Sequence, residues 1–128
     1  MRFFPRSCHF ILASFTALIF TGVIALAAPS DSVEQWNLFE ASFNGPTNGN
    51  PFVDVDFSAT FQQGDKAITV AGFYDGDGIY RVRFMPESTG GWTYRTHSNR
   101  PELDGQTGAL TVTVPSAENH GPVQVRDM

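Results

Sequence analysis

The sequence predicts an all-β protein, an antiparallel β-sandwich of about seven strands that follows an N-terminal signal peptide. Three observations predict this fold. Apolar residues alternate with polar ones along several short runs, most clearly at Tyr80, Val82 and Phe84, which share one side of a strand. Turn-forming glycine, proline, asparagine and aspartate separate these runs. After the N-terminal segment, no stretch repeats its apolar residues at helical spacing, so we expect no helix there.

Residues 1–27 have the pattern of a signal peptide. Arg2 and Arg6 form a basic start, an apolar run follows, and Ala25-Leu26-Ala27 fits the small-x-small rule for cleavage before Ala28. The apolar run is nearly as long as the roughly 20 residues that span a bilayer, so a retained membrane anchor is the alternative. We expect a secreted or periplasmic protein with no stable membrane insertion once the signal is removed.

The remainder is the size of one domain, which we place at residues 33–127 after a short linker at 28–32. About 100 residues are enough for an immunoglobulin-type sandwich. All 13 acidic residues lie after the signal segment and no basic stripe is present, which argues against nucleic acid as a partner. The single cysteine, Cys8, lies in the basic start and poorly fits a lipid-attachment site, so the domain is expected to fold without a disulfide.

The expected strands follow one another with short turns between them. Val33 to Phe43 changes the parity of its apolar residues, which indicates a bulge or a switch between sheets. The turn-rich segment 44–51 precedes the clearest alternation, over Phe52 to Gln62. Further strands are expected at 67–73, 80–85, 92–94, 110–114 and 122–126, with a turn at 75–78 and a polar loop at 99–107. Their shared parity predicts a buried set: Val53, Val55, Phe57, Phe61, Tyr80, Val82, Phe84, Trp92 and Leu110.

Acidic residues suggest two kinds of chemistry, and both have simpler interpretations. The run Asp75-Gly76-Asp77-Gly78 resembles part of a calcium loop, but position 86, where an EF-hand needs a bidentate glutamate, is Pro86, so a hairpin turn is favoured. Asp54 and Asp56 are spaced like a glycosidase acid pair, yet on one strand face they would point into water and flank no cleft.

Histidine and serine chemistry is also not favoured. His97 and His120 lie in turn-rich segments without the cysteines or spaced histidines of a zinc site. The sequence contains no Gly-x-Ser-x-Gly nucleophile motif. We therefore expect no catalytic residue, no cofactor and no metal.

Five residues are candidates for contact with a glycan or another domain. Trp36, Tyr74 and Trp92 are amphipathic aromatics that could stack on sugars, although buried core aromatics are the more common case. Ile79 and Met85 fall on the strand face opposite Tyr80, Val82 and Phe84, where a covering domain would leave an apolar patch.

Several motifs in fixed order resemble a known domain family. They are Val33-Glu34-Gln35-Trp36 with Phe39-Glu40, Asn50 to Val55, Gly72 to Gly78 leading into Tyr80 to Pro86, Gly91 to Tyr94, and Asn119-His120-Gly121-Pro122-Val123. This pattern resembles the immunoglobulin-like N-terminal domain of unknown function that precedes a (β/α)-barrel catalytic domain in secreted bacterial proteins classed as glycoside hydrolases.

The resemblance implies a non-catalytic accessory domain that packs against a barrel starting just after the Gly-Pro-Val stretch. It transfers no catalytic residue to this chain. Because the sequence stops at Met128, we expect either a fragment of a longer protein or a detached module. The alternative function is a free-standing carbohydrate-binding module that uses exposed aromatics on a polysaccharide.

Overall fold

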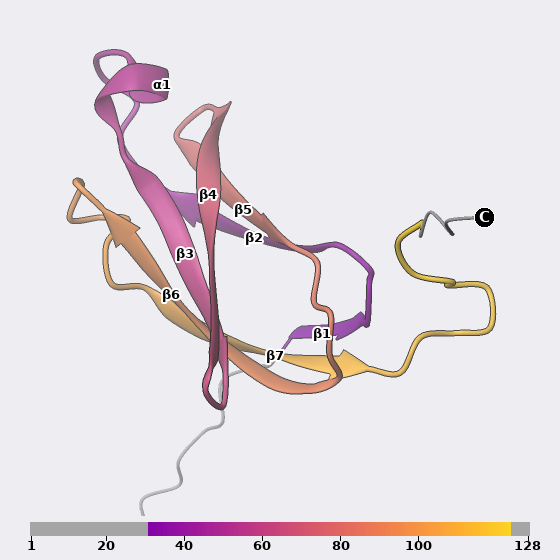
Figure 1. Ribbon diagram of the computed structural model, residues 1–128. Coiled ribbons are helices and arrows are strands. Elements are labelled where there is room, and N and C mark those ends of the chain that lie inside the picture. The colour runs from indigo at the N-terminus through magenta and orange to yellow at the C-terminus, as the bar shows by residue number, and fades with distance from the viewer. Residues whose placement is uncertain (1–30, 124–128) are drawn as a thin grey trace, which may run out of the picture.

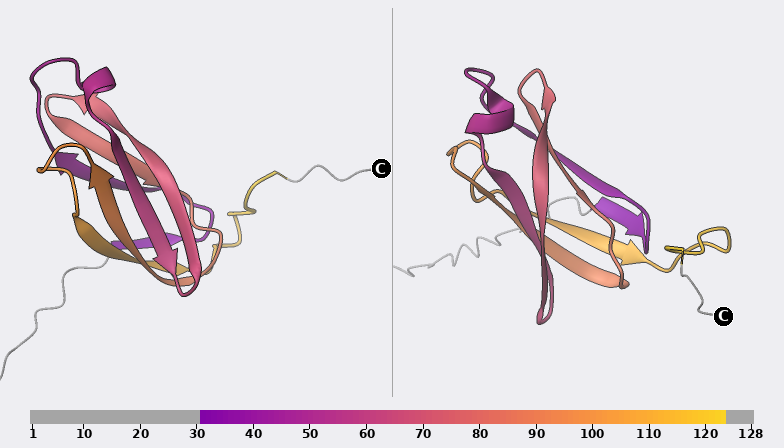
Figure 2. Two further views of the ribbon diagram at one scale, coloured as in Figure 1. Left: turned by 60° about the vertical axis from the view of Figure 1, so that its left-hand side comes forward. Right: turned by 45° about the horizontal axis from the view of Figure 1, so that its top comes forward.

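The computed structural model describes residues 31–123, so the expected signal peptide at 1–27 lies outside the described residues. The described part forms seven strands and one short helix. In chain order they are β1 (Asp31–Glu34), β2 (Phe39–Asn44), α1 (Pro51–Asp54), β3 (Phe57–Gln63), β4 (Lys66–Gly76), β5 (Ile79–Phe84), β6 (Gly90–Ser98) and β7 (Thr107–Thr113). Figure 1 and Figure 2 show these strands in two layers that face each other.

The long strand β4 joins the two layers. The hydrogen-bonded order is β1-β7-β6-β3-β4-β5-β2. Lys66 to Ala71 of β4 pair with β3, whereas Gly72 to Gly76 pair with β5. One strand, β4, therefore belongs to both layers. The two facing layers confirm the predicted sandwich. The pairing of β1 with β7 is parallel and the others are antiparallel, so the sheet is mixed rather than wholly antiparallel as expected.

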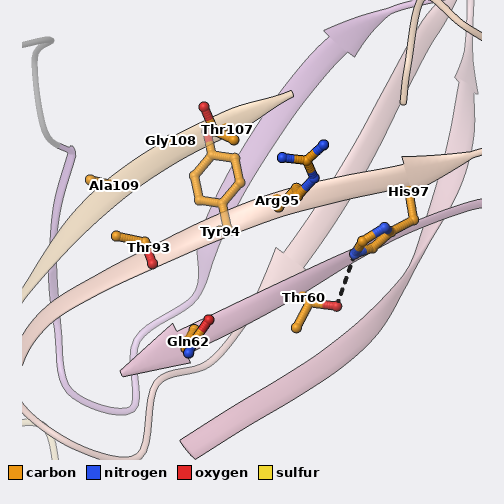
Figure 3. Close-up of a pocket in the computed structure, with 9 residues that line it drawn as sticks. All are labelled: Thr60, Gln62, Thr93, Tyr94, Arg95, His97, Thr107, Gly108 and Ala109. Carbon is orange, nitrogen blue, oxygen red and sulfur yellow. Dashed lines mark hydrogen bonds between the residues drawn. The ribbon is translucent and has the colours of Figure 1, made fainter. Parts of the chain in front are cut away.

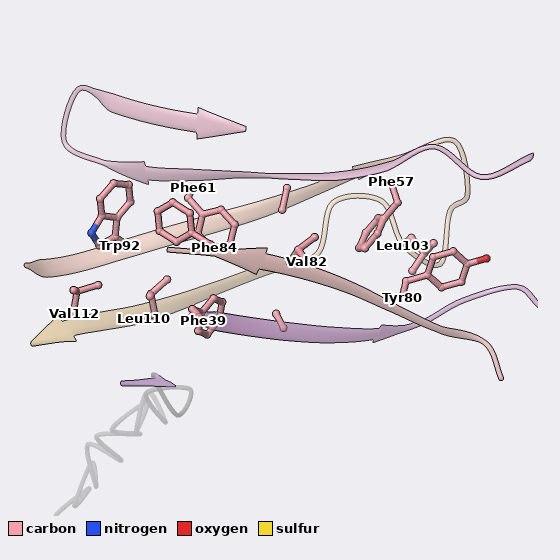
Figure 4. Packing of buried hydrophobic residues seen from close by; sticks show 12 residues of the cluster. Phe39, Phe57, Phe61, Tyr80, Val82, Phe84, Trp92, Leu103, Leu110 and Val112 are labelled. Atoms are coloured by element: carbon pink, nitrogen blue, oxygen red, sulfur yellow. The ribbon is translucent and has the colours of Figure 1, made fainter. Parts of the chain in front are cut away.

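The core is aromatic and lies between the layers, as Figure 4 shows. The Phe61 and Phe84 rings stack across it with centroids 4.1 Å apart, and Phe84 meets the edge of Trp92 at 5.1 Å. Burial of each such side chain stabilises the folded state by roughly 1.5–3 kcal/mol. Of the nine residues predicted to be buried, seven are: Phe57, Phe61, Tyr80, Val82, Phe84, Trp92 and Leu110.

The predicted strand over Phe52 to Gln62 begins five residues too early. Pro51 to Asp54 form α1, which corrects the expectation of no helix. Proline suits the first turn of a helix, where its missing N–H would have no partner. The N–H groups of Val53 and Asp54 donate to the Asn50 carbonyl at 3.0 and 2.8 Å. Val53 is consequently 75% exposed instead of buried, and Val55 is half-buried.

The parity change between Val33 and Phe43 is a switch between sheets. β1 pairs with β7 in one layer and β2 with β5 in the other. Residues 35–38 make the crossing, with Trp36 at a φ of 67°. A positive φ is uncommon for a residue other than glycine, and here it lies within the short turn that joins the two layers. Both Phe39 and Ala41 then face the core.

The remaining differences lie at loops and strand ends. The hairpin turn predicted within residues 75–78 is made by Asp77 and Gly78, both with positive φ, as a type I′ turn requires. The polar loop contributes an unexpected core residue, Leu103, which is fully buried. β7 ends at Thr113, so Val114 is 75% exposed. Pro122 and Val123 are not in a strand, and the rest of the last expected strand, 124–126, lies outside the described residues.

Candidate functional site

The five expected contact residues do not form one surface. Trp92 is 1% exposed, and its indole N–H donates to the Ser88 carbonyl at 3.0 Å, so it belongs to the core and cannot touch a sugar or a second domain. Tyr74 is half-buried against Phe52 and Tyr80, with ring centroids 5.2 and 5.0 Å away. Trp36 is half-buried at the opposite end of the molecule. The three aromatics therefore make no flat row for sugar stacking.

Ile79 and Met85 lie at the two ends of the β5 segment, with charges between them. Arg81 bonds to Glu40 at 2.5 Å and to Asp75 at 2.6 Å, and Arg83 bonds to Glu40 at 2.6 Å. The guanidinium of Arg83 also lies 4.9 Å from the centre of the Phe73 ring. The outer face of β2 and β5 is thus an ion-pair ladder, and the continuous apolar patch expected there does not form.

The two arginines set the charge state of this ladder. Hydrogen bonds from Arg83 and then Arg81 lower the pKa of Glu40. The bonds to Glu40 and then Asp75 raise the pKa of Arg81. Asp75 is paired with Arg81, and the residues after it form the hairpin turn. The Asp75 to Gly78 run therefore connects β4 to β5.

A shallow groove lies on the outer face of β3, β6 and β7. It has a volume of about 600 Å³, and the residues that line it include Gln62, Arg95 and His97 (Figure 3). Thr60 Oγ1 is 3.2 Å from His97 Nε2 and 2.9 Å from Thr69 Oγ1, so these side chains form a chain across three strands. Such a groove can offer hydrogen bonds to hydroxyl groups, but it brings no pair of carboxylates together.

The two acidic residues considered for catalysis lie in different local structures. The Asp54 carboxylate accepts the Asn50 N–H at 2.9 Å at the start of α1, whereas Asp56 precedes β3. They do not share a strand face as expected. Within residues 31–123 no group of three or more histidine, cysteine or acidic residues could hold a metal ion. His97 lies in β6, whereas His120 lies in the segment after β7.

Sequence reasoning missed the feature that brings distant motifs together, at the end of the sandwich where the chain leaves. The turn at 35–38 touches two other connections there. Gln35 N donates to the Thr113 carbonyl and Trp36 N to the Pro86 carbonyl, both at 2.9 Å. The Gln35 side chain also donates to the Glu87 carbonyl at 2.6 Å. The β1–β2 turn, the β5–β6 connection and the end of β7 therefore form one unit.

The segment after β7 is fastened to this unit. Glu34 Oε2 accepts hydrogen bonds from the Ser116 backbone at 3.3 Å, the Ser116 hydroxyl at 3.1 Å and the Asn119 amide at 3.4 Å. Asn119 also donates to the Gln35 carbonyl at 2.9 Å. These bonds, the one from the Ser116 backbone first, lower the pKa of Glu34. The motif at 33–36 thus holds the motif at 119–123.

Gly121 completes the fastening by lying against the Trp36 ring. Its φ is +73°, and a Cβ atom there would lie 2.7 Å from Trp36 Cδ2. Only glycine accommodates both the left-handed backbone and the close approach. The half-buried state of Trp36 therefore reflects a contact within the chain.

Three apolar side chains are exposed around the fastened segment. Leu38 is 58% exposed, Met85 49% and Val114 75%. Leu38 precedes Phe39 and Met85 follows Phe84, and these two phenylalanines are opposite each other in the β2–β5 pair. We call Leu38, Met85, Val114 and the fastened segment 116–123 the exit face. It lies at the opposite end of the sandwich from α1 (Figure 1, Figure 2).

Comparisons with known proteins assign this chain to a family. Residues 32–99 match the model for the domain of unknown function DUF5060. The chain belongs to the DUF5060 family. The family match covers β1 to β6 except Asp31, and β7 and the fastened segment follow it in the chain.

The chain is also similar to part of a protein of known structure. This DUF5060 domain is 47% identical, with a TM-score of 0.71, to part of a Bacteroides vulgatus ATCC 8482 protein described as a "putative glycoside hydrolase". The match covers 76% of this chain but only 19% of that one. A comparison with curated proteins finds no match. In the described part of the chain, no helix is long and apolar enough to cross a membrane.

Proposed function

We propose that this chain is the non-catalytic N-terminal accessory domain of a secreted glycoside hydrolase, and that it packs against a catalytic (β/α)-barrel. The observation that carries the proposal is the 47% identity to a segment that makes up only 19% of the Bacteroides protein. A module of that size beside a much larger remainder has the proportions of an accessory domain. Residues 1–27, with the pattern of a signal peptide, supply the export that a secreted hydrolase needs.

The chemistry of the domain agrees with a supporting role. Four of its acidic side chains are used within the fold: Glu34 fastens the C-terminal segment, Glu40 and Asp75 hold arginines, and Asp54 accepts the N–H of Asn50. A glycosidase needs two free carboxyl groups across a cleft. Exposed apolar residues at both ends of the sandwich, in contrast, suit contact with another domain.

The test replaces the matched segment of the Bacteroides protein with this chain. We expect this fusion to melt at least 5 °C above the Bacteroides protein from which the segment is deleted, because docking removes apolar surface from water. The chain by itself should release no reducing sugar from a panel of polysaccharides.

Two results would contradict the proposal. One is a fusion that melts no higher than the truncated protein. The other is sugar release by the pure chain that Asp54→Asn or Asp56→Asn abolishes. Retardation of the chain in gels that contain a polysaccharide, together with no gain in the fusion, would favour the free-standing carbohydrate-binding module, for which the groove over β3, β6 and β7 is the available surface.

A further inference from the structure

We infer that the exit face is the surface on which the sandwich docks the domain that follows it in the chain. The inference rests on the proposed function and adds the location of the contact. Its occupant is the remainder of a glycoside hydrolase chain such as the Bacteroides protein, attached after the fastened segment. A second copy of this chain and the opposite end of the sandwich are the competing possibilities.

The direction in which the chain leaves favours this face. Segment 116–123 is held by Glu34, Gln35 and Trp36, so the chain departs from the β1–β2 turn at a fixed place. A free linker would let the next domain take many positions. A fastened one places that domain beside Leu38, Met85 and Val114.

Distance argues against the opposite end. The large apolar side chains exposed at that end are Phe52 and Val53 on α1, which are 74% and 75% exposed. The seven residues of β7 run between the two ends, and seven residues of strand span roughly 23 Å at about 3.3 Å each. A domain joined after Val123 meets the exit face directly but would have to reach back along the whole strand to cover α1.

The exit face also has the composition of a contact surface. Its exposed apolar side chains are Leu38, Met85, Val114 and Val123, and Glu87, two positions after Met85, pairs with Lys66 at 3.1 Å. Apolar residues with a polar rim are typical of surfaces between domains. Backbone hydrogen bonds between the three connections hold these residues in place, so docking would need little rearrangement.

The test uses the fusion of this chain with the remainder of the Bacteroides protein and a matched pair of substitutions. Val114→Lys changes the exit face, and Val53→Lys changes the same residue type at the same 75% exposure on α1. Met85→Lys is a second exit-face variant. We expect Val114→Lys and Met85→Lys to split the melting of the fusion into two separate transitions, or to remove at least half of its gain in melting temperature. Val53→Lys should leave the melting unchanged.

Each substitution is also made in the chain alone, where it should shift the melting temperature by less than 2 °C. Loss of docking is then separated from loss of folding. A fusion that is stabilised as expected but responds only to Val53→Lys would overturn this inference and leave the proposed function intact. An unmodified fusion with no stabilisation would overturn both. A chain that is dimeric alone and becomes monomeric with Val114→Lys would assign the exit face to a second copy instead.

Discussion

At the scale of single residues, Glu34 joins the two ends of the domain sequence. Its carboxylate collects three hydrogen bonds from Ser116 and Asn119, more than 80 positions away. The residue types gave no sign of this role, because a glutamate at the end of a strand is usually a solvated side chain. Trp36 is similar: its ring suggested sugar stacking, but it is partly covered by Gly121 of its own chain.

The fastening by Glu34 should depend on pH. Hydrogen bonds to the charged form lower its pKa below the ordinary value of 4.5, so the carboxylate is easier to ionise in the folded protein than in the unfolded one. The stabilisation is complete above the unfolded value and is lost as the pH falls through the folded pKa. We expect the Ser116 amide resonance to titrate with a midpoint below 4.5, and Glu34→Gln to abolish that titration. An amide that titrates at or above 4.5 would contradict this assignment.

At the scale of elements, alternation predicted strands well where the side chains belong to a regular ladder. The run from Phe57 to Phe61 and the run from Tyr80 to Phe84 face the core as predicted. The pattern failed at Val53, where an apolar residue continued the alternation by chance while Asn50 and Pro51 started a helix. Local turn chemistry therefore decided the structure there, and the alternation did not.

The loop between β6 and β7 shows the opposite failure, because its polar composition hid a core residue. Leu103 is fully buried, and its carbonyl accepts a hydrogen bond of 2.5 Å from the Thr96 hydroxyl. Thr96 Oγ1 also accepts the Gln106 N–H at 2.8 Å. A buried threonine thus holds the loop at two points and inserts Leu103 into the core.

We expect Leu103→Ala to lower the free energy of unfolding by about 2–5 kcal/mol, the usual cost of a leucine-sized cavity. Val114→Ala, which shortens an exposed side chain, is the control and should change it by about 0.5 kcal/mol or less. Urea unfolding of the two variants measures both values. A loss below about 1 kcal/mol for Leu103→Ala would mean that the loop is not part of the core.

At the scale of the whole molecule, β4 couples the two layers because it pairs with a strand of each. Its first half pairs with β3 and its second half with β5. Gly72, at the crossing, has no side chain and so leaves room for the Phe57 ring to pack against the backbone. The sequence predicted two layers but not which strand they share, because strand pairing depends on contacts far apart in the chain. The exit face was not predictable for the same reason.

The shared strand predicts that both layers unfold together. Neither layer can lose β4 without exposing the other half of the aromatic core, so partly unfolded forms should be poorly populated. The chain has two tryptophans, and Trp36→Phe leaves Trp92 in β6 as the only one, reporting on the layer with β3 and β7. We expect its fluorescence and the far-ultraviolet circular dichroism of all strands to give the same urea midpoint.

Val82→Ala, placed in the other layer on β5, should shift both midpoints equally, since it opens a cavity in the common core. If Val82→Ala moved the dichroism midpoint and left the Trp92 midpoint in place, the layers would be independent and β4 would not couple them.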